Sequence, residues 1–243
     1  GNTHLIQGLY DAHRNGAKVL AIASHIPSRQ IGSKFFQETH PEAIFQECSS
    51  YCEMVNSAEQ GGVILHHAIQ NTMAGNGVSV LVIPGDVSMQ EAEDDTFTSS
   101  AISSGRPIVF PDPAEAAALT QAINEAETVA LFVGAGVKNA REQVLALAEK
   151  IKAPIGHALG GKMYIQYDNP FDVGMSGLLG YGAAHEATHE ADLLILLGTD
   201  FPYNDFLPDA NVAQVDIDGT HIGRRTRIKY PVTGDVAATI ENI

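Results

Sequence analysis

Small and polar residues recur in the second half of the chain, directly after apolar runs that have the length of β-strands. These groups occupy residues 134–136, 158–162, 174–177, 198–202, 216–218 and 234–235. Glycine at such positions lets backbone N–H groups approach a phosphate, and a helix N-terminus at Lys138 or Asn139 would offer its positive dipole end to an anion. Asp216 and Asp218 could accept hydrogen bonds from ribose hydroxyls or an adenine amine. Because ligands of open parallel sheets lie across the carboxyl ends of the strands, the pattern predicts an extended ligand at one sheet edge.

The first of these groups departs from the fingerprint of ordinary dinucleotide sites. Gly134-Ala135-Gly136 continues into Val137-Lys138-Asn139 and lacks the third glycine, and no acidic residue stands about 20 residues further on. An NAD site of the Rossmann type is therefore disfavoured. A tight turn explains any single glycine equally well, so the prediction of a ligand depends on the whole set of strand ends.

Residues 185–189 read His-Glu-Ala-Thr-His, a pattern in which two histidines one helical turn apart hold zinc and a glutamate activates water. Zinc also needs a third protein ligand, and none follows at the spacings known for such sites. The alternating alanines and glutamates are typical of a solvated helix face. We therefore expect no metal ligand in this chain.

Two groups in the first half could position a substrate. Residues 25–28, His-Ile-Pro-Ser, follow an expected strand, and Phe36, Gln37 and Glu38 lie in the polar loop beyond it. A helix cap with an anchoring phenylalanine is the alternative, and the residues alone leave both open. His66 and His67 are interpreted as surface or rim residues.

The two cysteines, Cys48 and Cys52, are four residues apart in a segment with helical character. We expect them on one helix face as free, inert thiols, which fits a reducing, cytoplasmic compartment. A metal site would need more soft ligands than these two.

Strand-like apolar runs alternate with segments of helical period, which predicts parallel strands joined by helical crossovers. In the first half we expect strands at 18–23 and 78–83 and helices at 41–54 and 58–74. In the second half we expect helices at 114–125, 139–150 and 183–191, strands at 128–133, 154–159, 192–198 and 213–217, and a last strand and helix within 230–243. Residues 193–197 are apolar on both faces, as in a sheet covered by helices on both sides.

The alternation fails between Asp86 and Pro113, where acidic residues precede a Ser/Thr-rich stretch and three prolines. A structureless loop of that length is unusual within one domain, so we interpret it as an interdomain linker.

Composition excludes several classes of protein. The chain has 243 residues and a net charge of −15, which disfavours nucleic acid as a partner. Its longest apolar runs are far shorter than the roughly 20 residues that cross a bilayer. Because the chain starts with Gly1-Asn2-Thr3, an amphipathic segment follows at once, and neither an initiator Met nor a signal peptide is present, we expect an excised piece of a longer chain.

Taken in order, a series of segments resembles the thiamine diphosphate-dependent pyruvate oxidases, most closely the quinone-linked pyruvate dehydrogenases of bacteria. The likeness extends over nearly all of the chain except 91–106. The segments that carry it are residues 2–9, 21–27, 36–41 (Phe-Gln-Glu-Thr-His-Pro), 80–86 (ending Pro-Gly-Asp), 152–155, 167–170, 174–177 and 197–203 (Leu-Gly-Thr-Asp-Phe-Pro-Tyr).

The resemblance implies an α/β fold of open parallel sheets with helices on both faces. Residues 1–86 match the C-terminal half of the domain that binds the aminopyrimidine of thiamine diphosphate, 87–112 form a linker, and 113–243 match a complete central, Rossmann-like FAD-binding domain. The family's cofactor-activating glutamate and its Mg²⁺-binding segment match nothing in this sequence, so neither role is transferred.

The family's site residues carry over to two regions of this sequence. Phe36 and Gln37 match a catalytic loop between thiamine and flavin, where they would contact the substrate-derived intermediate and the isoalloxazine. The implied FAD contacts are strand-end residues: Gly134, Ala135, Gly136, Ala158, Leu159 and Lys162 around the ribityl and diphosphate; Gly174, Met175, Ser176, Gly177, Thr199, Asp200 and Phe201 nearer the flavin; and Asp216, Ile217, Asp218, Gly234 and Asp235 around the adenosine. One departure is Gly160-Gly161-Lys162, where relatives often place a bulkier or charged residue.

The implied activity belongs to a longer parent chain, and we expect none from these residues alone. Pyruvate would be decarboxylated on thiamine diphosphate with Mg²⁺, and two electrons would pass through FAD to a quinone, giving acetate and CO₂. The alternatives are an acetolactate synthase, in which FAD would be structural, a phosphate-dependent pyruvate oxidase, or a nucleotide-binding or oligomerisation module with no redox role. The family implies a homotetramer in the cytoplasm, with peripheral contact at the inner face of the cell membrane only through a C-terminal extremity that this sequence lacks.

Overall fold

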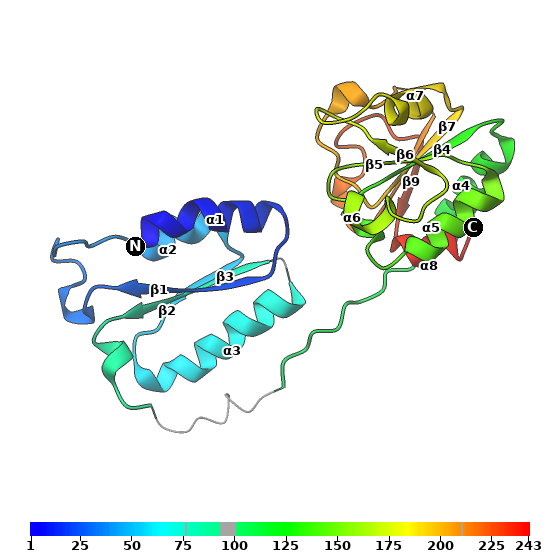
Figure 1. The fold of residues 1–243 in the computed structure, drawn as a ribbon. Helices are drawn as coiled ribbons and strands as arrows, with labels where there is room; N and C mark the ends of the chain where they lie inside the picture. The colour runs from blue at the N-terminus through cyan, green and yellow to red at the C-terminus, as the bar shows by residue number, and fades with distance from the viewer. Residues whose placement is uncertain (76, 93–100, 210) are drawn as a thin grey trace. The chain divides into compact units, whose positions relative to one another are not determined.

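The computed structural model describes residues 1–75, 77–92, 101–209 and 211–243. The chain divides into two compact α/β units, residues 1–106 and 107–243 (Figure 1). Both contain a sheet of parallel strands, as the sequence predicts. None of the helices in the described ranges combines the length and apolar character that a bilayer span requires.

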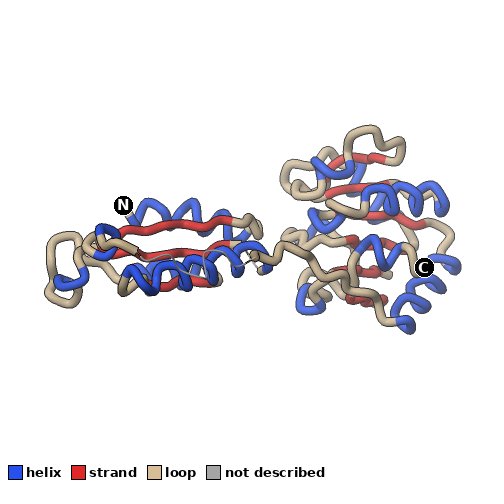
Figure 2. Tube along the Cα trace, turned by 90° about the horizontal axis from the view of Figure 1, so that it is seen from below, coloured by secondary structure: helices blue, strands red, loops and turns tan. Residues whose placement is uncertain are grey.

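The first unit is a three-stranded sheet between helices. Its strands are β1 (Val19–His25), β2 (Tyr51–Met54) and β3 (Val78–Pro84), in the order β1-β3-β2. Helices α1 (Asn2–Arg14) and α2 (Pro41–Phe45) lie on one face and α3 (Ala58–Ala74) on the other (Figures 1 and 2). The central strand is apolar on both sides because Val80 packs in the cluster with Phe45, whereas Leu81 packs with Ile64 of α3.

The prediction of a single helix at 41–54 is wrong. The α2 helix ends at Phe45, a 3-10 turn follows at Gln46–Cys48, and the next residues form β2. The Ser50 N–H donates to the Val78 carbonyl (2.9 Å), so pairing with β3 outweighs the local helical pattern.

As a consequence, Cys48 and Cys52 do not share a helix face. Burial raises the pKa of both thiols, that of Cys52 to about 11, which keeps them protonated at neutral pH. Protonated thiols are poor nucleophiles, in agreement with the expected inert state.

The second unit is a six-stranded parallel sheet with helices on both faces. In spatial order its strands are β6 (Asp172–Met175), β5 (Ile155–His157), β4 (Val129–Val133), β7 (Leu193–Leu197), β8 (Val212–Asp216) and β9 (Tyr230–Thr233). Its helices are α4 (Pro113–Glu125), α5 (Arg141–Ile151), α6 (Lys162–Ile165), α7 (Ala183–Glu190) and α8 (Val236–Ile240). Leu131 and Ile195 pack in one core cluster, and Phe132 and Leu196 in a second cluster with Phe201. Helices α4, α5 and α8 lie on one side of this sheet and α7 on the other (Figure 1), which explains why the central strands are apolar throughout.

Several boundaries in this unit differ from those expected. The α5 helix begins at Arg141 and not at Lys138 or Asn139, because a 3-10 turn at Ala135–Val137 comes first. The strand expected at 154–159 is limited to β5, and Gly174 and Met175 lie inside β6 rather than after it. The short α6 and β6 were not among the expected elements.

Parts of the expected linker at 87–112 belong to the compact units. Val87 is buried in the first unit, in the cluster that contains Leu81. In the second unit, the Asp235 N–H donates to the Val109 carbonyl at 2.8 Å. Residues 93–100 of the expected linker lie outside the described residues.

Candidate functional site

The carboxyl ends of neighbouring strands meet at one edge of the six-stranded sheet. Val133 of β4 pairs with His157 of β5 and with Leu197 of β7, and Asp216 of β8 pairs with Thr233 of β9. The expected ligand contacts lie at these strand ends or directly after them. The topology therefore brings the groups at 134–136, 158–162, 198–201, 216–218 and 234–235 to one edge, as the sequence argument requires.

The loops that follow β4 and β7 are in backbone contact. A Cβ atom on Gly134 would lie 2.5 Å from the Gly198 carbonyl oxygen, and one on Gly136 would lie 2.6 Å from the Gly198 Cα. The Gly134 and Gly136 N–H groups donate to the carbonyls of Leu197 and Gly198, at 3.0 and 2.9 Å. These two glycines thus allow close packing of the loops, and their amides are already used within the protein.

The end of β6 offers a buried polar group without a partner. Ser176 is buried, and its hydroxyl oxygen finds no hydrogen-bond partner among the residues that the structure describes. The turn is tight because Gly177 has a φ of +106° and packs against the rings of Phe201 and Tyr203. A buried hydroxyl without a partner is costly, and a polar group of a ligand would satisfy it.

The carboxylates of Asp216, the last residue of β8, and Asp218, which follows the strand, differ in what they do. Asp216 is buried, and its Oδ1 accepts from the Asp218 N–H (2.9 Å) and lies 3.3 Å from His221 Nδ1. Asp218 has a side chain that is 49% exposed, and its Oδ1 accepts from the Thr220 N–H. Hydrogen bonds from Thr220 hold the pKa of Asp218 below its usual value, and the charges of His221 and Arg224 act in the same direction. Asp216 therefore shapes the turn, whereas Asp218 keeps an ionised carboxylate that solvent can reach.

The remaining candidates have internal roles that the sequence alone did not indicate. Asp200 binds Arg225 through two hydrogen bonds of 3.0 and 3.2 Å, and Arg224 approaches the same carboxylate at 3.5 Å. Asp235 caps α8 by accepting from the Ala237 N–H, and Phe201 is buried against Phe132. The residues that reach the surface of this edge include Ala135, Leu159, Ile217 and Asp218.

Sequence reasoning did not identify His157 or the two arginines. His157 is buried at the end of β5, with Nε2 3.6 Å from Asp172 Oδ1, and desolvation lowers its pKa. The position of His157 at the end of an expected strand could have identified it from the sequence. The two arginines could have been identified by the concentration of basic residues at 224–229, because the chain has only 14 lysines and arginines in total.

In the first unit, Phe36 and Gln37 line a cavity at the carboxyl end of β1. Its volume is about 540 Å³, and its other lining residues are Gly1, Asn2, Thr3, Ser24, His25, Ile26, Pro27, Phe35 and Thr39. Phe36 is 79% exposed, so it is not the core anchor of the alternative interpretation. The structure thus places His25 and the pair Phe36-Gln37 at one cavity, whereas their part in catalysis stays a prediction.

The two histidines of the zinc-like pattern lie side by side on α7. Their ring centroids are 3.9 Å apart, and His189 Nδ1 is 2.9 Å from the His185 carbonyl oxygen. Across the described ranges, no cluster of three or more His, Cys, Asp or Glu side chains could hold a metal ion. Within those ranges, the pair has no third protein ligand of the kind that zinc requires.

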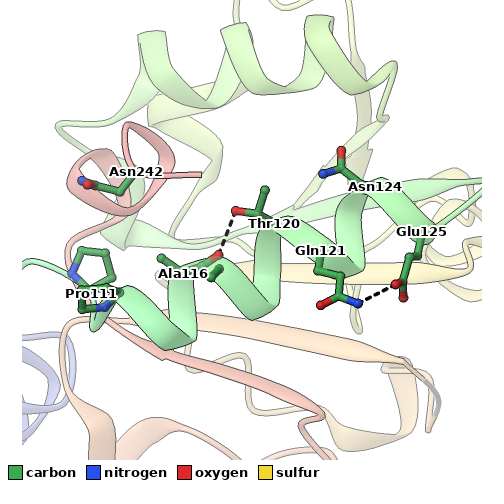
Figure 3. Close-up of a pocket in the computed structure, with 9 residues that line it drawn as sticks. Pro111, Ala116, Thr120, Gln121, Asn124, Glu125 and Asn242 are labelled. Carbon is green, nitrogen blue, oxygen red and sulfur yellow. Dashed lines mark hydrogen bonds between the residues drawn. The ribbon is translucent and has the colours of Figure 1, made fainter.

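A separate cavity of about 630 Å³ runs along α4 (Figure 3). Three of its polar side chains bond within the protein: Thr120 donates to the Ala116 carbonyl, Gln121 to Glu125, and Asn242 to the Ala238 carbonyl. None of the predicted site residues lines it. Because these side chains are used within the protein and the predicted site residues lie outside its lining, this cavity is a weaker candidate than the strand-end edge.

The second unit is thus an open parallel α/β domain whose strand-end groups meet at one edge of the sheet. The family model described as the central domain of thiamine pyrophosphate enzymes matches residues 116–243. This chain belongs to the thiamine pyrophosphate enzyme family.

Three relatives extend the match over the whole chain. An uncharacterised 42.6 kDa protein of Pseudomonas amyloderamosa is 48% identical over 99% of this chain and 61% of its own length. The protein YdaP of Bacillus subtilis, named as thiamine pyrophosphate-containing, is 37% identical over 96% of this chain and 40% of its own. The pyruvate oxidase of Lactiplantibacillus plantarum is 27% identical over 100% of this chain and 41% of its own length. Acetolactate synthases are 25–30% identical. The chain thus spans 40–61% of the length of the three relatives described.

Proposed function

We propose that this chain is the flavin-binding part of a thiamine diphosphate- and FAD-dependent enzyme that oxidises pyruvate to acetate and CO₂ and passes the electrons to a quinone. The observation that carries the proposal is the convergence of five strand-end groups at one edge of the six-stranded sheet. Membership of the thiamine pyrophosphate enzymes and the likeness to a pyruvate oxidase support it.

The residues at this edge fit a flavin nucleotide. The unpartnered Ser176 hydroxyl provides a polar contact, and Asp218 provides an ionised acceptor for ribose hydroxyls or the adenine amine. Leu159 and Ile217 are exposed apolar side chains that an aromatic ring system would cover. When bound, FAD supplies two-electron redox chemistry, and the protein orients it and limits its access to water.

The first unit would supply residues that contact the substrate. In this proposal residues 1–86 are half of a pyrimidine-binding domain, and Phe36 and Gln37 contact the substrate-derived group from the cavity beside His25. Thiamine diphosphate and Mg²⁺ belong to the parent enzyme, a cytoplasmic homo-oligomer in this proposal.

An acetolactate synthase is the second candidate, because several relatives carry that name at 25–30% identity. The same edge would then hold FAD as a structural group. The two candidates differ in whether electrons leave the bound flavin for an external acceptor.

The proposal predicts that the chain binds FAD at one site and that Asp218→Asn weakens this binding roughly tenfold, because one charge-assisted hydrogen bond is lost. Asparagine keeps the oxygen that accepts from Thr220, so the turn should persist. The measurement is calorimetric titration with FAD, checked by the visible absorption band. Glu127→Gln is the matched control, since it removes an exposed charge just before β4, at the opposite edge. Equal affinity in both variants, or no binding by a folded chain, would count against a flavin site.

A further inference from the structure

Residues 32–38, named here the Glu38 loop, have an unusual backbone. Gly32, Lys34 and Gln37 adopt left-handed conformations, with φ of +88°, +60° and +64°. Two of these three residues are not glycine, and such conformations persist only where surrounding interactions hold them.

Burial does not supply those interactions. Every residue from 31 to 37 is exposed, including Phe35 and Phe36. A loop without buried side chains has few apolar contacts that could favour one conformation. Hydrogen bonds must therefore hold its backbone.

The Glu38 side chain provides these hydrogen bonds. Its Oε1 accepts a hydrogen bond from the Gly32 N–H, and its Oε2 accepts from the Phe35 N–H at 3.1 Å. The Glu38 N–H in turn donates to the Phe35 carbonyl at 2.9 Å. Two backbone N–H groups of the loop thus converge on one anion, which is a side chain of the same loop.

We propose that Glu38 is a positioning residue: its carboxylate holds the backbone of residues 32–37 so that Phe36 and Gln37 stay at the cavity beside β1. The role of Phe36 and Gln37 as substrate contacts rests on the proposed function, whereas the placement of the loop by Glu38 does not. The amides of Gly32, Lys34 and Phe35, and the imidazole of His40, hold the pKa of Glu38 below its usual value, although partial burial opposes this. Glu38 is therefore ionised at neutral pH, and its hydrogen bonds to the loop persist there.

The test compares Glu38→Gln and Glu38→Ala with Glu47→Gln, a control that removes an exposed charge from the same unit. We expect amide hydrogen exchange at Gly32 and Phe35 to accelerate roughly tenfold in both Glu38 variants, the effect of losing about one charge-assisted hydrogen bond. Cleavage by chymotrypsin at Phe35 and Phe36 should accelerate in parallel. The control should leave both rates unchanged, and the strands of the first unit should keep their protection in all variants.

A fluorinated phenylalanine at position 36 reports on positioning directly. In the unsubstituted chain its ¹⁹F signal should be sharp at neutral pH and move toward the free amino-acid value as acid protonates Glu38, because a carboxyl with a lowered pKa loses its contribution as the pH falls through that pKa. In Glu38→Gln the signal should sit near the free value at every pH. An unchanged signal and unchanged exchange in both Glu38 variants would overturn the proposal. Neither readout needs a cofactor, so a chain that fails to bind FAD would refute the proposed function and leave this inference standing.

Discussion

Gly134→Ala should destabilise the second unit by about 3 kcal/mol, since the added Cβ meets backbone that cannot move aside. The new atom would lie 2.5 Å from the Gly198 carbonyl oxygen and 2.7 Å from the Thr199 Cα, closer than real Cβ contacts. Both atoms belong to the loop after β7, whose N–H at Gly198 is bonded to the Val215 carbonyl. Relief of the clash would therefore disturb three adjacent strand ends.

The measurement is the free energy of unfolding in urea, followed through amide signals of β4 and β7 so that only the second unit is observed. Gly160→Ala is the control, because a Cβ there would meet the Ala135 Cβ at an ordinary 3.6 Å. We expect its effect to stay within about 0.5 kcal/mol. Equal stability of the two variants would contradict the close approach of the loops.

Asp216→Ala should cost the second unit about 2 kcal/mol, because it removes a buried hydrogen-bond acceptor. The Asp218 N–H would lose its partner at 2.9 Å, and His221 would lose a carboxylate at 3.3 Å. The Asp216 side chain is 7% exposed, so water replaces these bonds poorly.

Thermal unfolding of the second unit measures this effect, with Asp205→Ala as the control for loss of an exposed carboxylate. A small effect at Asp216, no larger than at Asp205, would show that the turn after β8 does not depend on it. The expected loss of stability is also why Asp218, and not Asp216, is the better probe of FAD binding.

The predictable part of the fold came from buried strands and long helices. Residues 193–197 and 129–133 are apolar on both faces, and they form the central strands β7 and β4. The helix expected at 58–74 matches α3 in both bounds. In these segments the local pattern and the tertiary environment agree.

The features that were not predictable depend on contacts between distant residues. The four residues of β2 become a strand only because β3, which begins at Val78, lies beside them. The contact of Gly134 with Gly198 and the pairing of Asp200 with Arg225 join loops that sequence spacing does not connect. The sequence could therefore indicate the edge of the sheet, but not which of its polar groups remain available to a ligand.

The most direct test of the central claim is to map where FAD contacts the chain, by amide chemical shifts recorded during titration. If the carboxyl edge of the six-stranded sheet is the flavin site, the largest changes should occur at Ala135, Ser176, Thr199 and Asp218. Changes confined to Thr120, Gln121 and Asn124 beside the cavity on α4, or no changes in a folded chain, would contradict the assignment of this edge as the flavin site.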